Sequence, residues 1–121
     1  MDFKFSQKSS DLQEKMNKFF QDHIFPNEEA YEKAILDSGD PLHIPELLDE
    51  LKDKARKEGL WNLFLPDSEH GAGLTNVDYA PLAEITGQVW WAPEVFNCSA
   101  PDTGNMEILA EFGTQEQKDQ W

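Results

Sequence analysis

The side chains that could support chemistry in this 121-residue chain are three histidines, one cysteine and 24 carboxylates. His23, His43 and His70 lie far apart in the sequence, and none has a second ligand at the spacing of a metal site. Cys98 could act as a nucleophile only beside a base, but its segment contains no histidine, and a small buried side chain is the alternative role. Ser99 lacks the glycine-flanked turn of a hydrolase serine. Residue chemistry alone therefore predicts no self-contained catalytic site.

Residues 90–106 concentrate the unusual residue types of the chain. They include two adjacent tryptophans, two prolines, the cysteine and a glycine, and they lie between two segments of helical period. Trp90, Trp91 and Phe96 are large enough to anchor a core or an interface, and contact with a ligand is the alternative. The helices on both sides must hold this segment in place.

Apolar residues recur every three to four positions along most of the chain, which predicts amphipathic helices. No internal repeat and no strand pair with hairpin chemistry interrupts this period. The predicted fold class is therefore an all-α helical bundle. The expected helices are a first one from Ser9 or Ser10 to about Ile24, a short segment at 28–36, and further helices at 45–58, 75–86, 102–112 and from 114 onwards.

Capping and helix-breaking residues define the expected ends of the first helices. We expect Ser10 to cap the first helix, Pro26 to interrupt it, and Asn27 to cap the short segment that follows. Pro45 suits the first turn of the next helix, and Gly59 is expected to end it.

The same kind of signal marks the later helices. Thr75 with Asp78 three residues on predicts a start that resembles a capping box, and Pro81 in the second turn predicts a bend. Thr114 with Gln117 predicts another such start.

The connection between the helices at 45–58 and 75–86 has no helical period. Residues 60–66 are interpreted as an extended, buried connection, and residues 67–74 as a loop. Gly71 and Gly73 resemble a fragment of a phosphate-cradling motif, but no strand precedes them and no third glycine opens a helix. The interpretation that we favour is that both glycines are turn residues with unusual backbone angles.

The composition favours one folded domain over residues 1–121. Hydrophobic residues make up 39% of the chain, and a chain of this length can bury about two thirds of its unfolded surface. The formal net charge of −14 argues against binding to nucleic acid or to an anionic membrane. No leader sequence is recognised, and no apolar run of about 18 residues predicts a membrane span. One cysteine excludes an internal disulfide and suits a reducing compartment, so we expect the cytoplasm, or an organelle matrix for a eukaryotic protein.

Several motifs in the last two thirds of the chain form a specific pattern. They are Gly59-Leu60-Trp61, Leu65-Pro66, His70-Gly71-Ala72-Gly73-Leu74, Asp78-Tyr79-Ala80-Pro81-Leu82-Ala83-Glu84, Ala92-Pro93-Glu94-Val95-Phe96-Asn97-Cys98-Ser99-Ala100-Pro101-Asp102-Thr103-Gly104-Asn105-Met106-Glu107, Phe112-Gly113-Thr114 and Glu116-Gln117-Lys118. Together they resemble the N-terminal helical domain of the acyl-CoA dehydrogenases, most of all the branch that is fused to a phosphotransferase-like domain in vertebrates. The resemblance covers about residues 47–121 and, weakly, the first helix. It departs from the family at 70–73, where many members have Tyr-Gly-Gly-x-Gly.

The resemblance implies a division of labour between this chain and domains that it lacks. A complete subunit of that family adds a middle β domain and a C-terminal four-helix domain, which hold FAD and a catalytic glutamate for the α,β-dehydrogenation of acyl-CoA thioesters. The chain then has no matching catalytic or cofactor-binding positions. We expect it to bind no FAD and to be inactive alone.

The resemblance also implies where the fatty-acyl tail lies. The segment 96–106 starts and enters the helix that forms one wall of the acyl pocket in this family. Gly104 would let another group approach the backbone closely; the alternative is that Asp102 caps the helix and Gly104 forms a turn. The side chains expected to contact the acyl tail are Phe96, Cys98, Ser99, Thr103 and Met106.

A second functional hypothesis is a free-standing helical module that binds a partner or an acyl group without catalysis. Such a module is expected to be a monomer or dimer with its aromatic residues covered, whereas a truncated domain is expected to expose the apolar surface that meets its missing neighbours. We therefore expect self-association of the chain or docking to the missing domains.

Overall fold

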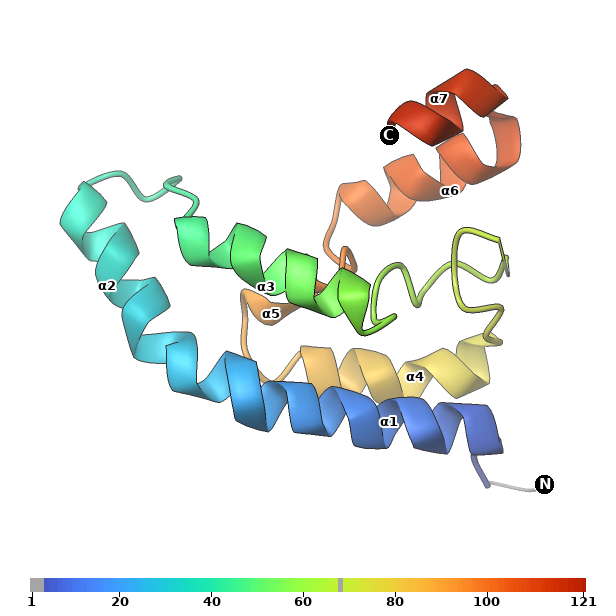
Figure 1. Cartoon of the computed structure of the whole chain (residues 1–121), viewed down its shortest axis with the longest axis horizontal. Helices are drawn as coiled ribbons and strands as arrows, with labels where there is room; N and C mark the ends of the chain where they lie inside the picture. The colour runs from blue at the N-terminus through green and yellow to red at the C-terminus, as the bar shows by residue number, and fades with distance from the viewer. Residues whose placement is uncertain (1–3, 68) are drawn as a thin grey trace.

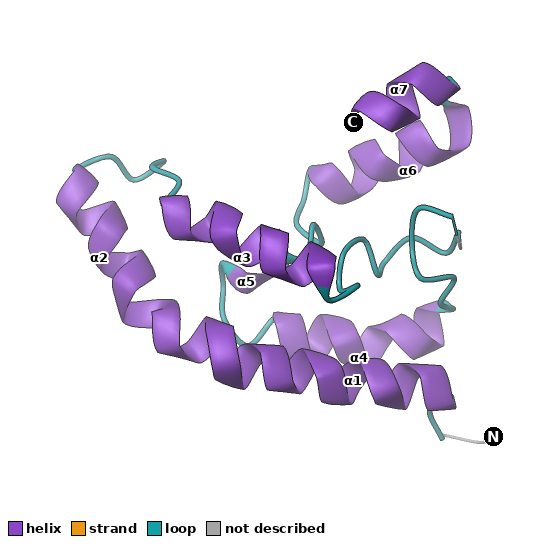
Figure 2. Cartoon of the chain, in the orientation of Figure 1, coloured by secondary structure: helices purple, strands orange, loops and turns teal. Residues whose placement is uncertain are grey.

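The computed structural model describes residues 4–67 and 69–121, and Ser68 of the predicted loop lies outside this part. Within the described residues every regular element is helical, which confirms the all-α fold class (Figures 1 and 2). No helix among them is both long and apolar enough to cross a membrane. The elements are α1 (Gln7–Phe19), the π-helical η1 (Phe20–Ile24), the 3₁₀-helical η2 (Phe25–Asn27), α2 (Glu28–Ser38), α3 (Glu46–Lys57), α4 (Asn76–Thr86), α5 (Ala92–Val95), α6 (Asp102–Phe112) and α7 (Gln115–Gln120).

Helix α1 begins earlier than its apolar pattern indicates. The hydroxyl of Ser6 accepts a hydrogen bond from the backbone N–H of Ser9 at 3.1 Å, so Ser6 is the capping residue. Ser10, the predicted cap, lies inside the helix and donates its hydroxyl to the carbonyl of Ser6. That prediction was wrong because the first turn is polar and the apolar period starts only at Leu12. Ser9 is buried and donates to the carbonyl of Asp78 at 2.8 Å, which joins α1 to α4.

Pro26 interrupts the α-helical pattern without separating two helices by a loop. The backbone changes to π-helical and then 3₁₀ turns between α1 and α2, which accommodate a residue that has no N–H to donate. Asn27 occupies the capping position of α2, as predicted, but its side chain makes no capping hydrogen bond, and its amide donates instead to the carbonyl of His23 at 2.8 Å. The chain therefore bends without leaving the helical region (Figure 1).

Helix α3 begins one residue later than predicted, since Pro45 occupies its capping position and the first turn starts after it. The end is as predicted. Gly59 has a left-handed backbone with φ +69° and donates to the carbonyl of Arg56 at 3.0 Å. Leu60 donates to Ala55 at 2.9 Å, which completes the hydrogen-bond pair typical of a glycine-terminated helix.

The predicted starts of two later helices are confirmed. At α4, the hydroxyl of Thr75 accepts from the N–H of Asp78 at 3.2 Å and donates to its carboxylate at 2.8 Å. At α7, Thr114 and Gln117 form a reciprocal capping box. Both signals are local, so neither depends on the tertiary fold.

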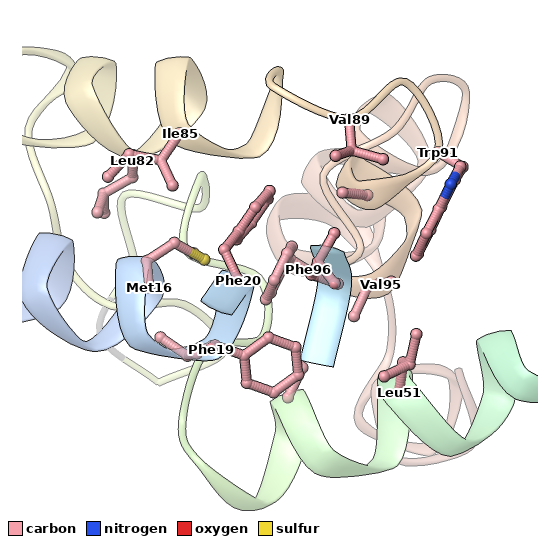
Figure 3. Packing of buried hydrophobic residues seen from close by; sticks show 14 of the residues in the cluster. Met16, Phe19, Phe20, Leu51, Leu82, Ile85, Val89, Trp91, Val95 and Phe96 are labelled. Carbon is pink, nitrogen blue, oxygen red and sulfur yellow. The ribbon is translucent and has the colours of Figure 1, made fainter. Parts of the chain in front are cut away.

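The core lies between α1, α3, α4 and the segment around α5 (Figure 3). Phe96 is fully buried there, with its ring 5.3 Å from that of Phe19 and 5.9 Å from that of Phe20, centroid to centroid. Trp91 is buried and stacks on Tyr31 with centroids 4.4 Å apart. Trp91 and Phe96, two of the three aromatic residues predicted to anchor a core or an interface, are thus core residues.

Helices α6 and α7 pack on each other and project from this core (Figure 1). Neither helix contains a buried residue. Ile108 and Phe112 on α6 are 61% and 74% exposed. The pair thus presents apolar side chains to its surroundings, which favours a covered interface in the working protein.

Candidate functional site

The connection 60–66 forms a turn, so the prediction of an extended segment was wrong. Asn62 has a left-handed backbone with φ 55°, and its carbonyl accepts from the N–H of Leu65 at 3.0 Å. Asparagine adopts this conformation more readily than other non-glycine residues. The turn was not predicted because the residues around Asn62 are mostly apolar and give no turn signal. The prediction of burial is confirmed for Leu60, Leu63 and Leu65.

The loop 67–74 folds around Asp67. Its carbonyl accepts from the N–H groups of Gly71 at 3.1 Å and Gly73 at 3.2 Å, and its carboxylate accepts from Glu69. Gly73 has φ +62°, and a Cβ at Gly71 would lie 2.3 Å from the carbonyl oxygen of Leu65. Both glycines are therefore turn residues, as predicted, but only Gly73 has the predicted unusual backbone angle, whereas Gly71 lacks the space for a side chain. Their N–H groups are directed at Asp67 rather than at a phosphate.

A pair of asparagines joins this connection to the segment 96–101. The side-chain amide of Asn97 donates to the side-chain oxygen of Asn62 at 2.6 Å, and the N–H of Asn62 donates to the carbonyl of Phe96 at 3.2 Å. Asn97 also has a left-handed backbone with φ 55°. Neither asparagine was predicted from the sequence, where the one available signal was the tolerance of asparagine for this conformation.

Phe96 and Cys98, both predicted to contact an acyl tail, lie at the inner end of the segment. Phe96 is a core residue, and the half-buried thiol of Cys98 donates to its carbonyl at 3.3 Å. Burial raises the pKa of the Cys98 thiol, and burial also raises the pKa of the neighbouring Tyr79 phenol. The thiol stays protonated near neutral pH, which agrees with its role as a small buried side chain rather than a nucleophile.

Ser99, Thr103 and Met106 face different surroundings. Ser99 lines a cavity of about 410 Å³ together with Trp90 and Trp91. Thr103 is half-buried, and its N–H donates to the carbonyl of Ser99 at 3.2 Å. Met106 lines a second cavity, of about 160 Å³, that separates the α6–α7 pair from the 62–70 connection. The predicted residues are therefore not gathered in one cavity of this chain.

The chain also matches a known family. Residues 6–121 fit the family model described as acyl-CoA dehydrogenase, N-terminal domain. The chain belongs to the acyl-CoA dehydrogenase family. Curated relatives of this acyl-CoA dehydrogenase domain include the mouse protein "Acyl-CoA dehydrogenase family member 10", which is 48% identical over 91% of the chain and 11% of that protein. "Probable acyl-CoA dehydrogenase FadE2" of Mycobacterium tuberculosis is 48% identical over 100% of the chain and 30% of that protein.

A solved structure agrees with the fold of this acyl-CoA dehydrogenase domain. "Structure of a putative acyl-CoA dehydrogenase from Mycobacterium abscessus" superimposes with a TM-score of 0.83 and 45% identity, over 98% of the chain and 31% of that protein. The chain thus spans less than a third of these acyl-CoA dehydrogenases and matches their N-terminal domain.

The start of α6 bears on the alternative in which Asp102 caps the helix and Gly104 forms a turn. Pro101 occupies the capping position without a side-chain hydrogen bond, Asp102 is the first helical residue, and Gly104 lies within the helix. The interpretation of Asp102 as the cap and Gly104 as a turn was therefore wrong. Apart from its chain neighbours and the backbone of its own helix, no atom lies within 4 Å of a Cβ built at Gly104. The space beside this residue is open to another group.

The described residues offer no metal-ligand group in the acyl-CoA dehydrogenase domain. No three or more histidine, cysteine, aspartate or glutamate side chains converge there in a way that could hold an ion. In the segment 96–106, Asn97 donates to the side chain of Asn62 and Cys98 donates to the carbonyl of Phe96.

Proposed function

We propose that the chain supplies one wall of the acyl pocket of a flavin-dependent acyl-CoA dehydrogenase and is inactive without the remaining domains. The observation that carries this proposal is its match to the N-terminal domain alone, with 31% coverage of a related solved structure. The complete enzyme would convert an acyl-CoA thioester to its α,β-unsaturated product. FAD, which accepts the hydride in such a reaction, would be bound by the domains outside residues 1–121.

Within this proposal, the segment 96–106 gives the wall its shape. Phe96 anchors the inner end of the segment in the core, and α6 carries Thr103 and Met106 at its outer end. The open space at Gly104 supports a close approach of a substrate to the helix backbone. Cys98 and Ser99 would contact the acyl tail between these two ends.

The proposal further assigns the exposed apolar side chains of the α6–α7 pair to contacts with the missing domains or with a second copy of the chain. Ile108 and Phe112 would be covered by those contacts. A cytoplasmic location, or an organelle matrix in a eukaryote, would supply the reducing conditions that suit a free thiol.

The test is reconstitution from two pieces. The chain is mixed with, or fused to, the middle and C-terminal domains of a relative, and bleaching of the flavin absorbance is followed after addition of acyl-CoA. We expect flavin reduction by the combined protein and none by either piece alone. Turnover by the isolated chain would reject the inactivity that we propose, and binding of acyl-CoA to the isolated chain without flavin would instead favour a free-standing acyl-binding module.

A further inference from the structure

Buried side chains do not fix the position of α6 relative to the core. No residue of α6 or α7 is buried, and a cavity of about 160 Å³ lies between this pair and the 62–70 connection. In the described part of the chain, the side-chain hydrogen bonds of α6, α7 and the turn between them are internal, such as the one from the Lys118 ammonium to the carbonyl of Ala110 at 2.6 Å. Other contacts must therefore determine the direction in which the chain leaves the core.

Backbone hydrogen bonds from Asn97 to Glu94 at 3.2 Å and from Cys98 to Pro93 at 2.9 Å hold the point of departure to α5, and two asparagines join it to the 60–66 connection. Phe96 is fixed in the core, α6 starts at Asp102, and Asn97 lies at the inner end of the link between them. Its side-chain amide donates to Asn62 at 2.6 Å across 35 positions of sequence. Asn62 in turn binds the carbonyl of Phe96 through its backbone N–H at 3.2 Å. Both asparagines are half-buried, and an amide hydrogen bond is stronger there than at the surface.

The backbone of each asparagine adds to the argument. Both residues have φ 55°, a conformation that is strained for most side chains and that turns the chain sharply. The hydrogen bond between the two side chains joins the turn at Asn62 to the turn at Asn97. Asn62 also lines the same cavity as Met106. Asn62 therefore binds Asn97 at the start of the segment 96–106 and faces Met106 at its end.

We propose that Asn62 and Asn97 form a positioning pair that sets the direction of the 97–101 link and thereby the place of α6 and Met106. Neither side chain acts on the substrate. The consequence for an acyl tail rests on the proposed function, whereas the positioning itself concerns this chain alone and can be measured without a cofactor.

Asn97→Gly and Asn62→Gly test the positioning directly. Glycine keeps the left-handed backbone and the N–H groups but removes the side-chain bond. Spin labels are attached at Lys54→Cys on α3 and Glu111→Cys on α6 in a Cys98→Ser background, and their distance distribution is measured by pulsed electron resonance. We expect one narrow distance in the parent chain and a broad distribution in each glycine variant.

Two comparisons make this result specific to the pair. The double variant should broaden the distribution no further than either single variant, because both remove the same bond. Asn105→Ala, at an exposed asparagine of α6, should leave the distance narrow. Unchanged narrow distances in Asn97→Gly, or in Asn62→Gly if the first variant does not fold, would overturn the proposal.

The consequence for the substrate is measured in the reconstituted enzyme. Asn97→Gly should raise the KM for acyl-CoA while kcat and flavin content stay near those of the parent, because a displaced wall loses binding to the tail and not to the reacting carbons. A broadened distance with an unchanged KM would reject the link to the acyl tail. An inactive parent enzyme would count against the proposed function and leave the distance result to decide the positioning.

Discussion

Neighbouring aromatic residues of the chain have opposite surroundings. Trp91 is buried against Tyr31, while Trp90 is 71% exposed and touches the same tyrosine only edge-on, with centroids 5.7 Å apart. Phe96, five residues later, is fully enclosed between the rings of α1 and η1. Aromatic type alone therefore did not distinguish a core anchor from a surface side chain.

At the residue scale, Phe96→Ala is expected to destabilise the chain by about 3–5 kcal/mol, because it leaves a cavity among Phe19 and Phe20. Trp90→Ala should cost about 1 kcal/mol or less, since its side chain loses mainly one edge contact. Denaturant unfolding followed by circular dichroism measures both values. Equal costs for the two variants would contradict the assignment of Phe96 to the core.

The reactivity of Cys98 is a second prediction at this scale. Burial raises the pKa of its thiol, so the fraction of thiolate near neutral pH is small and access is restricted. We expect slow reaction with a disulfide reagent at pH 8 in the folded chain and fast reaction in denaturant. Equally fast labelling of the folded chain would show that the thiol is open to solvent.

At the scale of elements, the helix ends depend on residues at different distances along the chain. Gly59 ends α3 through its own backbone, and Thr75 caps α4 through a residue three positions away. Pro26, by contrast, is tolerated inside a continuous helical path because the turns before and after it change type. Local signals predicted the first two ends, whereas the change of helix type around Pro26 was not predicted.

Two glycines with equally open surroundings provide a matched test. A Cβ at Gly59 or at Gly104 would meet no atom within 4 Å, but only Gly59 has a left-handed backbone. Gly59→Ala should destabilise the chain by about 1–2 kcal/mol, and Gly104→Ala should stabilise it by about 0.4–1 kcal/mol. Thermal unfolding of the two variants measures the difference. A loss of stability in Gly104→Ala would contradict the regular helical backbone of α6.

At the scale of the whole molecule, the exposed apolar side chains Ile108 and Phe112 of α6, with Trp121 just after α7, favour self-association of the isolated chain. We expect its apparent mass in sedimentation velocity to rise with concentration, and Phe112→Asp to remove the increase by placing a charge on this surface. Leu42→Asp is the control, since Leu42 is 85% exposed and lies in the connection between α2 and α3. A monomer at all concentrations, or an equal effect of the two variants, would contradict the prediction.

The sequence by itself determined the helical period, the ends marked by Gly59, Thr75 and Thr114, and the motifs that identify the family. These features depend on residues within a few positions of one another or on residue types at fixed spacing, so no tertiary contact is needed to read them. The family motifs likewise predicted which segment forms the candidate acyl wall.

Only the tertiary structure decided how the parts of that segment are arranged. It placed Phe96 in the core, left Met106 beside a cavity, and joined Asn97 to Asn62 across 35 positions of sequence. It also turned the 60–66 connection where an extended segment was expected. The reason is physical: the left-handed asparagines and the half-buried amide bond between them involve partners that are distant in sequence, so neither leaves a periodic signal in the chain.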